Sequence, residues 1–294
     1  MDQKPKKFAL YAAFALACAV VFLVALFPRD AAREFVETRF AQIAPGLSLS
    51  VGEAGLAWPP GLALESPSIY TSSGDRLFSM DSLEVSVSPF SLFSSTPPVK
   101  VSAAAYGGRV EAAVARKPGG PDGYNQLDIL VTRAMDASRM DAVARLSGRE
   151  ITGSVTGRLT LTGPLADPLS GRGSGNLTLK NGSVAVDNPM LALKALNVET
   201  LSVDLELAGR TVKITRAELS GLHAQATAQG LLYPRSPLAG SRVDIQGTVA
   251  PTQELFKELG ADSPLGMALG GRSSSPRIRF RISGTLADPR LELL

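Results

Sequence analysis

The sequence predicts a mainly β protein, in which an N-terminal transmembrane helix precedes an antiparallel, curved or sandwiched β-sheet body with a few short capping helices. From residue 47 onward, short runs alternate apolar and polar residues, which is the period of half-buried strands. Gly, Pro, Asn and Asp punctuate nearly every junction between these runs, as expected of strands joined by turns. A charge-free stretch at 8–27 predicts the helix.

That stretch is long enough to cross a bilayer. Its 20 residues, at about 1.5 Å each, match a hydrocarbon core of roughly 30 Å. Three lysines lie in the leader at 1–7, and positive charge marks the cytoplasmic side. We therefore expect a single-pass membrane protein with a cytoplasmic N-terminus and an exported body. The residues assigned to the membrane anchor are Phe8, Leu16, Val20, Phe22, Leu26 and Phe27.

Two other interpretations of this segment stay open. A cleaved signal peptide also has a basic leader and an apolar stretch, although its apolar part is usually only about 7 to 15 residues long. Alternatively, Leu16-Ala17-Cys18 is a lipoprotein cleavage site that would acylate Cys18, but Ala15 stands where leucine is usual. Because Cys18 is the single cysteine, the part after the membrane has no thiol for a disulfide framework or a cysteine-based metal site.

Residues 28–46 predict a juxtamembrane helix that ends at Pro45-Gly46. Apolar residues at helical spacing give this segment one apolar face, formed by Phe35, Val36, Phe40 and Ile43. We expect the helix to pack the anchor against the folded body, or else to lie on the membrane surface.

Residues 47–294 predict one β-rich domain, which a loop and helix near 118–150 would subdivide. A cassette occurs twice, as TGPLADP at 162–168 and SGTLADP at 283–289, each time at the end of an alternating run. Glycine permits an unusual backbone dihedral and Asp-Pro opens a turn, so each copy should end a strand. Asn181-Gly182 is the strongest hairpin signal. The short helices are predicted at 136–146, 189–196 and 252–259.

The alternation leaves one apolar and one polar face on each strand. In the run at 202–207, for example, Val203 and Leu205 alternate with Asp204 and Glu206. A sheet built in this way cannot leave its apolar face in water. A second sheet, the capping helices or acyl chains in a groove would cover it, and we take burial by the protein itself as the default expectation.

Few residues suggest catalysis. His223 is the only histidine, so a Ser/His/Asp site would depend on it, yet it lies in an apparent strand. The glycines at 171–175 lack the lysine of a phosphate-binding loop, and the carboxylates are scattered rather than spaced as calcium ligands. Net charge is only +3, without a Lys/Arg cluster interleaved with aromatics, which argues against nucleic acid. We predict a non-enzymatic protein with no cofactor and no metal.

Two groups of residues are candidates for interaction. Trp58-Pro59-Pro60 is either a turn anchored by a buried indole or a stiff, extended recognition point for another envelope protein. Arg277, Arg279 and Arg281 share one face of a predicted strand. Like charges so placed repel one another, so this face should meet solvent, anionic lipid or a carboxylate-bearing protein.

The chain resembles the type II secretion system protein N family. The resemblance rests on the basic leader with its apolar segment, the Pro-Pro-Gly-Leu turn at 59–62 and the run RFRISGTLADP at 279–289. The strand ending Gly-x-Leu-x-x-Pro is also similar to that of AsmA-like envelope proteins. The first resemblance implies a non-enzymatic accessory component of type II protein secretion, anchored in the bacterial inner membrane with a periplasmic body. Such a component acts through protein contacts with other secretion components. The second implies a lipid-binding or lipid-transfer module with phospholipid in its groove.

Overall fold

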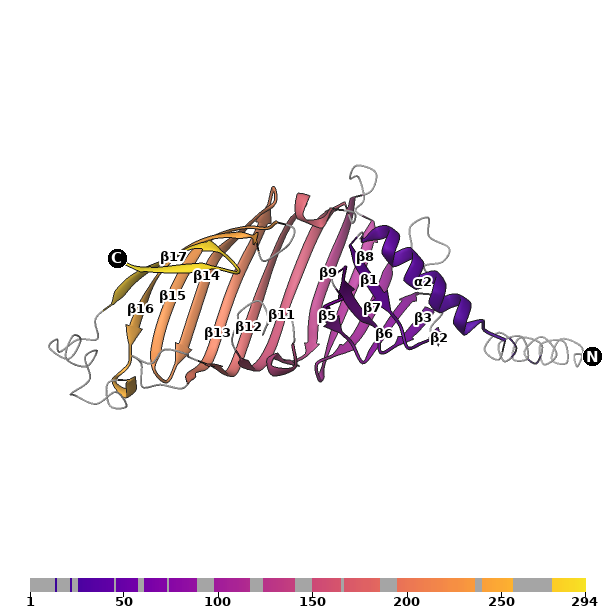
Figure 1. The fold of residues 1–294 in the computed structure, drawn as a ribbon, viewed down its shortest axis with the longest axis horizontal. Coiled ribbons are helices and arrows are strands. Elements are labelled where there is room, and N and C mark those ends of the chain that lie inside the picture. Colours follow the sequence, from indigo (N-terminus) through magenta and orange to yellow (C-terminus); the bar gives the residue numbers. More distant parts are fainter. Residues whose placement is uncertain are drawn as a thin grey trace, which may run out of the picture.

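The computed structural model describes residues 14, 22, 26–44, 46–57, 61–72, 74–88, 98–116, 124–140, 150–164, 167–185, 195–235, 240–255 and 277–294. These residues form a helix, a small sheet and one very long antiparallel sheet (Figure 1). The mainly β class and the antiparallel pairing are thus as predicted.

The predicted transmembrane helix needs correction. Among the described residues, no helix is both long enough and apolar enough to cross a membrane. Much of 8–27, including Phe8, Leu16 and Val20, lies outside the described residues. The neighbouring helix α2 (Arg29–Ile43) has 15 residues and confirms that a helix forms within the segment 28–46, where one was predicted. The prediction of a single-pass inner-membrane protein is corrected together with the prediction of the transmembrane helix.

Helix α2 packs over the first strands of the chain. It contacts β1 (Leu47–Ser50) and β2 (Glu53–Ala57). Strand β1 belongs to the small sheet, which has the order β1-β4-β5 and includes β4 (Ser68–Thr71) and β5 (Arg76–Ser79). A core cluster forms between these parts, in which the buried residues Val51, Ala54 and Leu64 are packed by Ala32, Val36, Leu49, Leu62 and Leu83.

The long sheet has 15 strands. Its order is β18-β17-β16-β15-β14-β13-β12-β11-β9-β8-β7-β6-β3-β2, and β10 (Met135–Asp136) pairs with β11 beside this path. The remaining strands are β3 (Gly61–Glu65), β6 (Ser82–Val87), β7 (Val99–Ala105), β8 (Gly108–Arg116), β9 (Tyr124–Arg133), β11 (Ile151–Pro164), β12 (Arg172–Ala185), β13 (Ala195–Ala208), β14 (Thr211–Gly221), β15 (Ala224–Tyr233), β16 (Arg242–Pro251), β17 (Ile278–Thr285) and β18 (Pro289–Leu293). From β6 onward the path follows the sequence, so strands adjacent in the chain lie side by side.

The register keeps all apolar rows on one face. Directly paired residues of antiparallel strands share a face, and the pairs Ile129↔Leu159, Leu177↔Val203 and Leu205↔Ile214 are all apolar. The neighbouring pairs Asp128↔Thr160 and Asp204↔Arg216 are all polar. Between Leu205↔Ile214 and Asp204↔Arg216 the residue Thr215 is skipped, so a bulge preserves the two faces.

The hairpin predicted at Asn181-Gly182 is wrong. Strand β12 continues through this dipeptide to Ala185, and Asn181 adopts a positive φ of 50° within it. The pairing with β13 passes from Lys180↔Thr200 to Gly182↔Val198. The left-handed backbone that favours Asn-Gly in hairpins is used here for a bulge in a long strand.

The repeated cassettes end strands as predicted. The first closes β11 at Pro164 and leads into a 3-10 helix (Pro168–Ser170) before β12. The second closes β17 at Thr285, where the Asp288 N–H donates to Thr285 Oγ1 at 3.1 Å. Each copy therefore joins two antiparallel neighbours.

The predicted short helices are only partly described. In 136–146 a 3-10 helix (Ala137–Arg139) forms, and 141–146 lies outside the described residues. In 189–196 the last two residues belong to β13, and in 252–259 residues 253–255 are helical. The rest of both segments lies outside the described residues.

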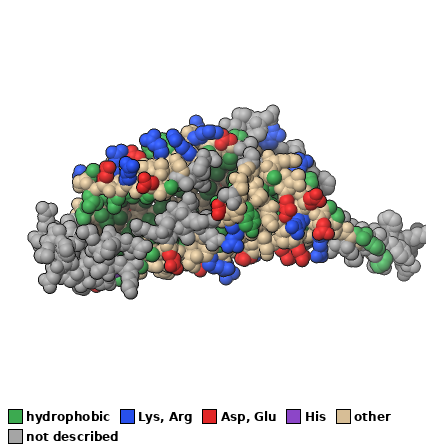
Figure 2. All heavy atoms as spheres, viewed as in Figure 1, with side chains coloured by type: hydrophobic (Ala, Val, Ile, Leu, Met, Phe, Trp, Pro, Cys, Tyr) green, Lys and Arg blue, Asp and Glu red, His purple; other side chains and the backbone are tan. Residues whose placement is uncertain are grey.

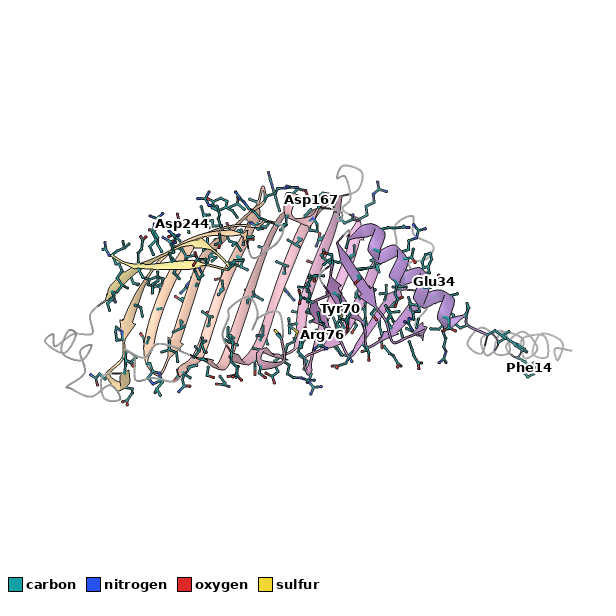
Figure 3. The ribbon with its side chains drawn as sticks, viewed as in Figure 1. Phe14, Glu34, Tyr70, Arg76, Asp167 and Asp244 are labelled. Atoms are coloured by element: carbon teal, nitrogen blue, oxygen red, sulfur yellow. The ribbon has the colours of Figure 1, made fainter. Side chains whose placement is uncertain are left out.

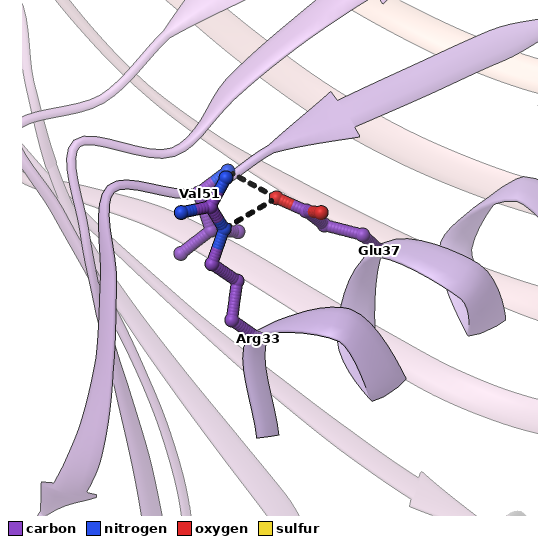
Figure 4. A network of polar contacts seen from close by, with 3 residues as sticks. All are labelled: Arg33, Glu37 and Val51. Atoms are coloured by element: carbon purple, nitrogen blue, oxygen red, sulfur yellow. Dashed lines mark hydrogen bonds and ion pairs between the residues drawn. The ribbon is translucent and has the colours of Figure 1, made fainter. Parts of the chain in front are cut away.

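Glu37 of α2 links the helix to the segment between β1 and β2 by a hydrogen bond. Its Oε1 accepts a hydrogen bond from the Val51 N–H at 2.9 Å and one from Arg33 Nε at 3.2 Å (Figure 4). Val51 is only 1% exposed, so its N–H has little access to water.

We expect Glu37→Ala to lower the free energy of unfolding by about 1–3 kcal/mol, because a buried N–H would lose its acceptor. Urea denaturation measures the change. Glu37→Gln keeps an acceptor oxygen and is the matched control, which should retain most of the stability. Equal losses in the two variants would show that the carboxylate charge matters and the hydrogen bond does not.

Candidate functional site

The most distinctive surface is the apolar face of the long sheet over β11–β16. Figure 2 shows a hollow there, with hydrophobic side chains on its floor. We call this surface the apolar groove. Its larger side chains are Leu159, Leu161, Leu177, Leu179, Leu201, Val203, Leu205, Ile214, Leu219, Leu232, Ile245 and Val249.

The groove is not covered as a protein core would be. Of these side chains, Leu177 is 45% exposed and the others are half-buried, whereas Val198, Leu207 and Val243, nearer the strand ends on the same face, are buried. By contrast, Leu64 of the same apolar face is 2% exposed beneath α2. The default expectation, burial by the protein itself, therefore holds at the N-terminal end and does not hold across the middle of β11–β16.

Glycines on the groove floor lie against large neighbours. A Cβ at Gly173 would come within 2.4 Å of Leu161 Cδ2, and one at Gly175 within 2.9 Å of Leu159 Cδ1. These leucines thus lie across the adjacent strand rather than standing upright. The result is a smooth floor, which a side chain at either glycine would interrupt.

The chemistry of the groove is uniform. In the described register, its aligned rows contain Leu, Val, Ile, Ala and Gly, with no charged and no aromatic side chain over β11–β16. The strand N–H and C=O groups bond to neighbouring strands. The groove therefore offers van der Waals contact without hydrogen-bond donors or acceptors, and it suits an apolar ligand.

The opposite face is polar and carries charges of both signs. A shallow depression of about 600 Å³ lies over β6–β11, with Glu84, Lys100, Glu111 and Arg158 among its lining residues. Within it, Thr160 Oγ1 donates to Asp128 Oδ1 at 2.8 Å. Mixed charge and internal hydrogen bonds are typical of a solvated face.

The structure brings Arg279 and Arg281 of β17, and Arg277 just before this strand, to the polar side of the sheet. Arg279 pairs with Thr248 and Arg281 with Gln246, whereas Arg277 directly precedes the strand and lines a depression with Thr248. Arg281 donates from Nε and Nη2 to the two carboxylate oxygens of Asp244, both at 2.9 Å. Figure 3 labels Asp244 on the C-terminal part of the sheet. Arg281 therefore has an acidic partner within its own chain.

This ion pair makes stability depend on pH. The hydrogen bonds from Arg281 lower the pKa of Asp244 below its ordinary value of 3.8. A lowered folded-state pKa adds stability above pH 3.8 that is lost as the pH falls through the folded pKa. We expect Asp244→Asn to melt slightly below the native chain at neutral pH, with the gap closing in acid. A gap that is constant with pH in thermal melts would contradict this.

Of the other predicted site residues, none that the structure describes lies in the groove. Trp58, Pro59 and Pro60 lie outside the described residues. Of the anchor residues, Phe22 is 64% and Leu26 75% exposed, and Phe27 is half-buried. His223 is 3% exposed at the turn between β14 and β15 rather than in a strand. Among the described residues, no group of three or more His, Cys, Asp or Glu could hold a metal ion.

The sequence predicted the apolar face and offered a groove as one of three ways to cover it, but it did not show where the face stays open. The missing step was the register, which aligns each apolar row with the next. A usable signal was present, since successive alternating runs joined by short turns favour neighbouring strands. No family model, curated protein or solved structure matches the chain.

Proposed function

We propose that this protein binds the acyl chains of lipids in the apolar groove, as a lipid-binding or lipid-transfer module. The observation that supports the proposal is the unbroken apolar face that is left half-open over β11–β16. Large contiguous apolar surfaces usually mark a binding site. Each Å² of apolar surface removed from water contributes about 25 cal/mol, so a bound chain gains free energy along the whole groove.

The shape and composition of the groove favour an acyl chain over a protein. Six neighbouring strands spaced about 4.8 Å apart extend over roughly 24 Å. One leaflet of a bilayer core of about 30 Å is about 15 Å thick, so a complete acyl chain fits. Protein interfaces, in contrast, are enriched in aromatic residues, Met and Arg, which are missing from the aligned rows of β11–β16.

Mass spectrometry of organic extracts from the purified full-length chain tests this function. We expect phospholipid or fatty acid to be recovered with the protein, and the delipidated protein to bind a fluorescent fatty acid. An extract without lipid, together with no binding of the probe, would rule the proposal out.

A second candidate function is supported by a different feature. Every residue of the edge strand β18 is exposed, which suits pairing with a strand from another protein. An accessory role in type II secretion through protein contacts would use such an edge. Affinity purification from cross-linked cells tests it, and an eluate lacking all secretion components would count heavily against it.

A further inference from the structure

Strand β18 is an open edge of the long sheet. Within the described residues it pairs with β17 and with no other strand. Its apolar residues are strongly exposed, with Leu291 at 66% and Leu293 at 70%. An exposed edge of this kind is a template for pairing with another chain.

The backbone groups that point away from the sheet can be assigned. The N–H of Leu294 donates to the Arg279 carbonyl at 2.9 Å, so Leu294 faces β17. Successive residues of a strand alternate in the direction of their N–H and C=O groups. Leu291 and Leu293 therefore direct theirs outward, and so does Pro289, which lacks an N–H.

We propose that a second copy of this chain pairs with β18 in antiparallel orientation, about a two-fold axis at Leu291. In this register Leu291 lies opposite the partner's Leu291, and Arg290 lies opposite the partner's Glu292. The outward groups of Leu291 exchange both hydrogen bonds with their counterparts, and the Leu293 N–H meets the partner's Pro289 carbonyl. The strand is thus complementary to itself in backbone, charge and apolar contact.

The charge pattern selects a second copy over an unrelated strand. On the polar face, Glu292 already pairs across the sheet with Arg281 of its own chain. In the dimer it would lie between Arg281 and the partner's Arg290, and the symmetry produces this arrangement twice. Opposite charges directly across a strand pair are stabilising, whereas like charges are destabilising.

The pairing would also join the two apolar faces. Leu291 pairs with Ile282, and Leu293 with Phe280, so both leucines lie on the apolar side of the sheet. A two-fold axis perpendicular to the sheet keeps the apolar faces of both copies on the same side. The dimer would have one continuous apolar surface with a copy of α2 at each far end. The pairing itself does not depend on what occupies the groove.

Cysteine cross-linking tests the register. In the full chain carrying Cys18→Ser, Leu291→Cys places two thiols at a hydrogen-bonded pair, where Cα atoms are about 5.5 Å apart and a disulfide can form. We expect a covalent dimer under mild oxidation. Leu177→Cys, also an exposed leucine of the apolar face, is the matched control and should remain monomeric.

Charge-reversal variants test the same register independently, in case one substitution weakens folding. Added to Leu291→Cys, Arg290→Glu makes the edge acidic and Glu292→Arg makes it basic. We expect each alone to lose about tenfold of its dimer, since two pairs become repulsive, and a mixture of the two to recover it. Cross-linking that ignores these charges, or occurs only with other proteins, would overturn the proposal.

Discussion

Leu177→Glu is expected to reduce the binding of acyl chains by at least about tenfold. Leu177 lies in the middle of the apolar groove, paired with Gly157 on one side and Val203 on the other. An acyl chain that covered this position would remove the hydrating water from the carboxylate or force it to bind a proton, and both are unfavourable. Because Leu177 is 45% exposed, the charge stays hydrated in the empty groove and the chain should still fold.

Thr178→Glu is the matched control for this change. Thr178 is the next residue of β12, and its pairing with Thr156 and Ser202 places it on the polar face. The same charge is thus introduced one position away, on the other side of the sheet. Binding of a fluorescent fatty acid should match that of the native chain. Equal losses of binding in both variants would show that the acyl chain does not bind in the groove.

The second large effect concerns stability. We expect Leu64→Ala to lower the free energy of unfolding by about 2–5 kcal/mol, the usual cost of a cavity in a packed core. Leu64 is 2% exposed and packs with Val51 and Ala54 beneath α2. Leu177→Ala removes the same atoms from the same face of the sheet, but from an open position. It should cost less than about 1 kcal/mol.

Urea denaturation of both variants compares the two ends of the apolar face. A large difference supports a sheet whose apolar side is covered by α2 at the N-terminal end and is open over β11–β16. Similar losses at Leu64 and Leu177 would mean that the two leucines are equally packed. The groove would then be part of the protein core.

The class of the fold could be predicted because alternation is a local property. The runs at 159–161 and 203–207 show which residues share a face without any knowledge of their partners. Which strands pair, and in which register, depends on contacts between distant residues. Asn181-Gly182 illustrates the limit, because the same positive φ serves a hairpin turn or a bulge, and the long pairing of β12 with β11 and β13 decides between them.

The candidate site was predictable only in part. That an apolar face exists follows from residues such as Val203 and Leu205, but what covers it does not, since alternation looks the same in a sandwich and in a single sheet. The segment at 8–27 shows a related limit: a charge-free run meets the length requirement for crossing a bilayer, yet hydropathy by itself does not establish a spanning helix. The helix α2, which follows this segment, packs on β1 and β2.

Photo-cross-linking with a fatty acid that carries a diazirine on its acyl chain tests the open groove most directly. The full-length protein would be loaded with this probe, irradiated and digested, and the labelled residues located by mass spectrometry. We expect labels on apolar-face positions of β11–β16, such as Leu177, Val203 and Leu205. Labels confined to the polar face, or an unlabelled β11–β16 in protein that binds the probe, would contradict it.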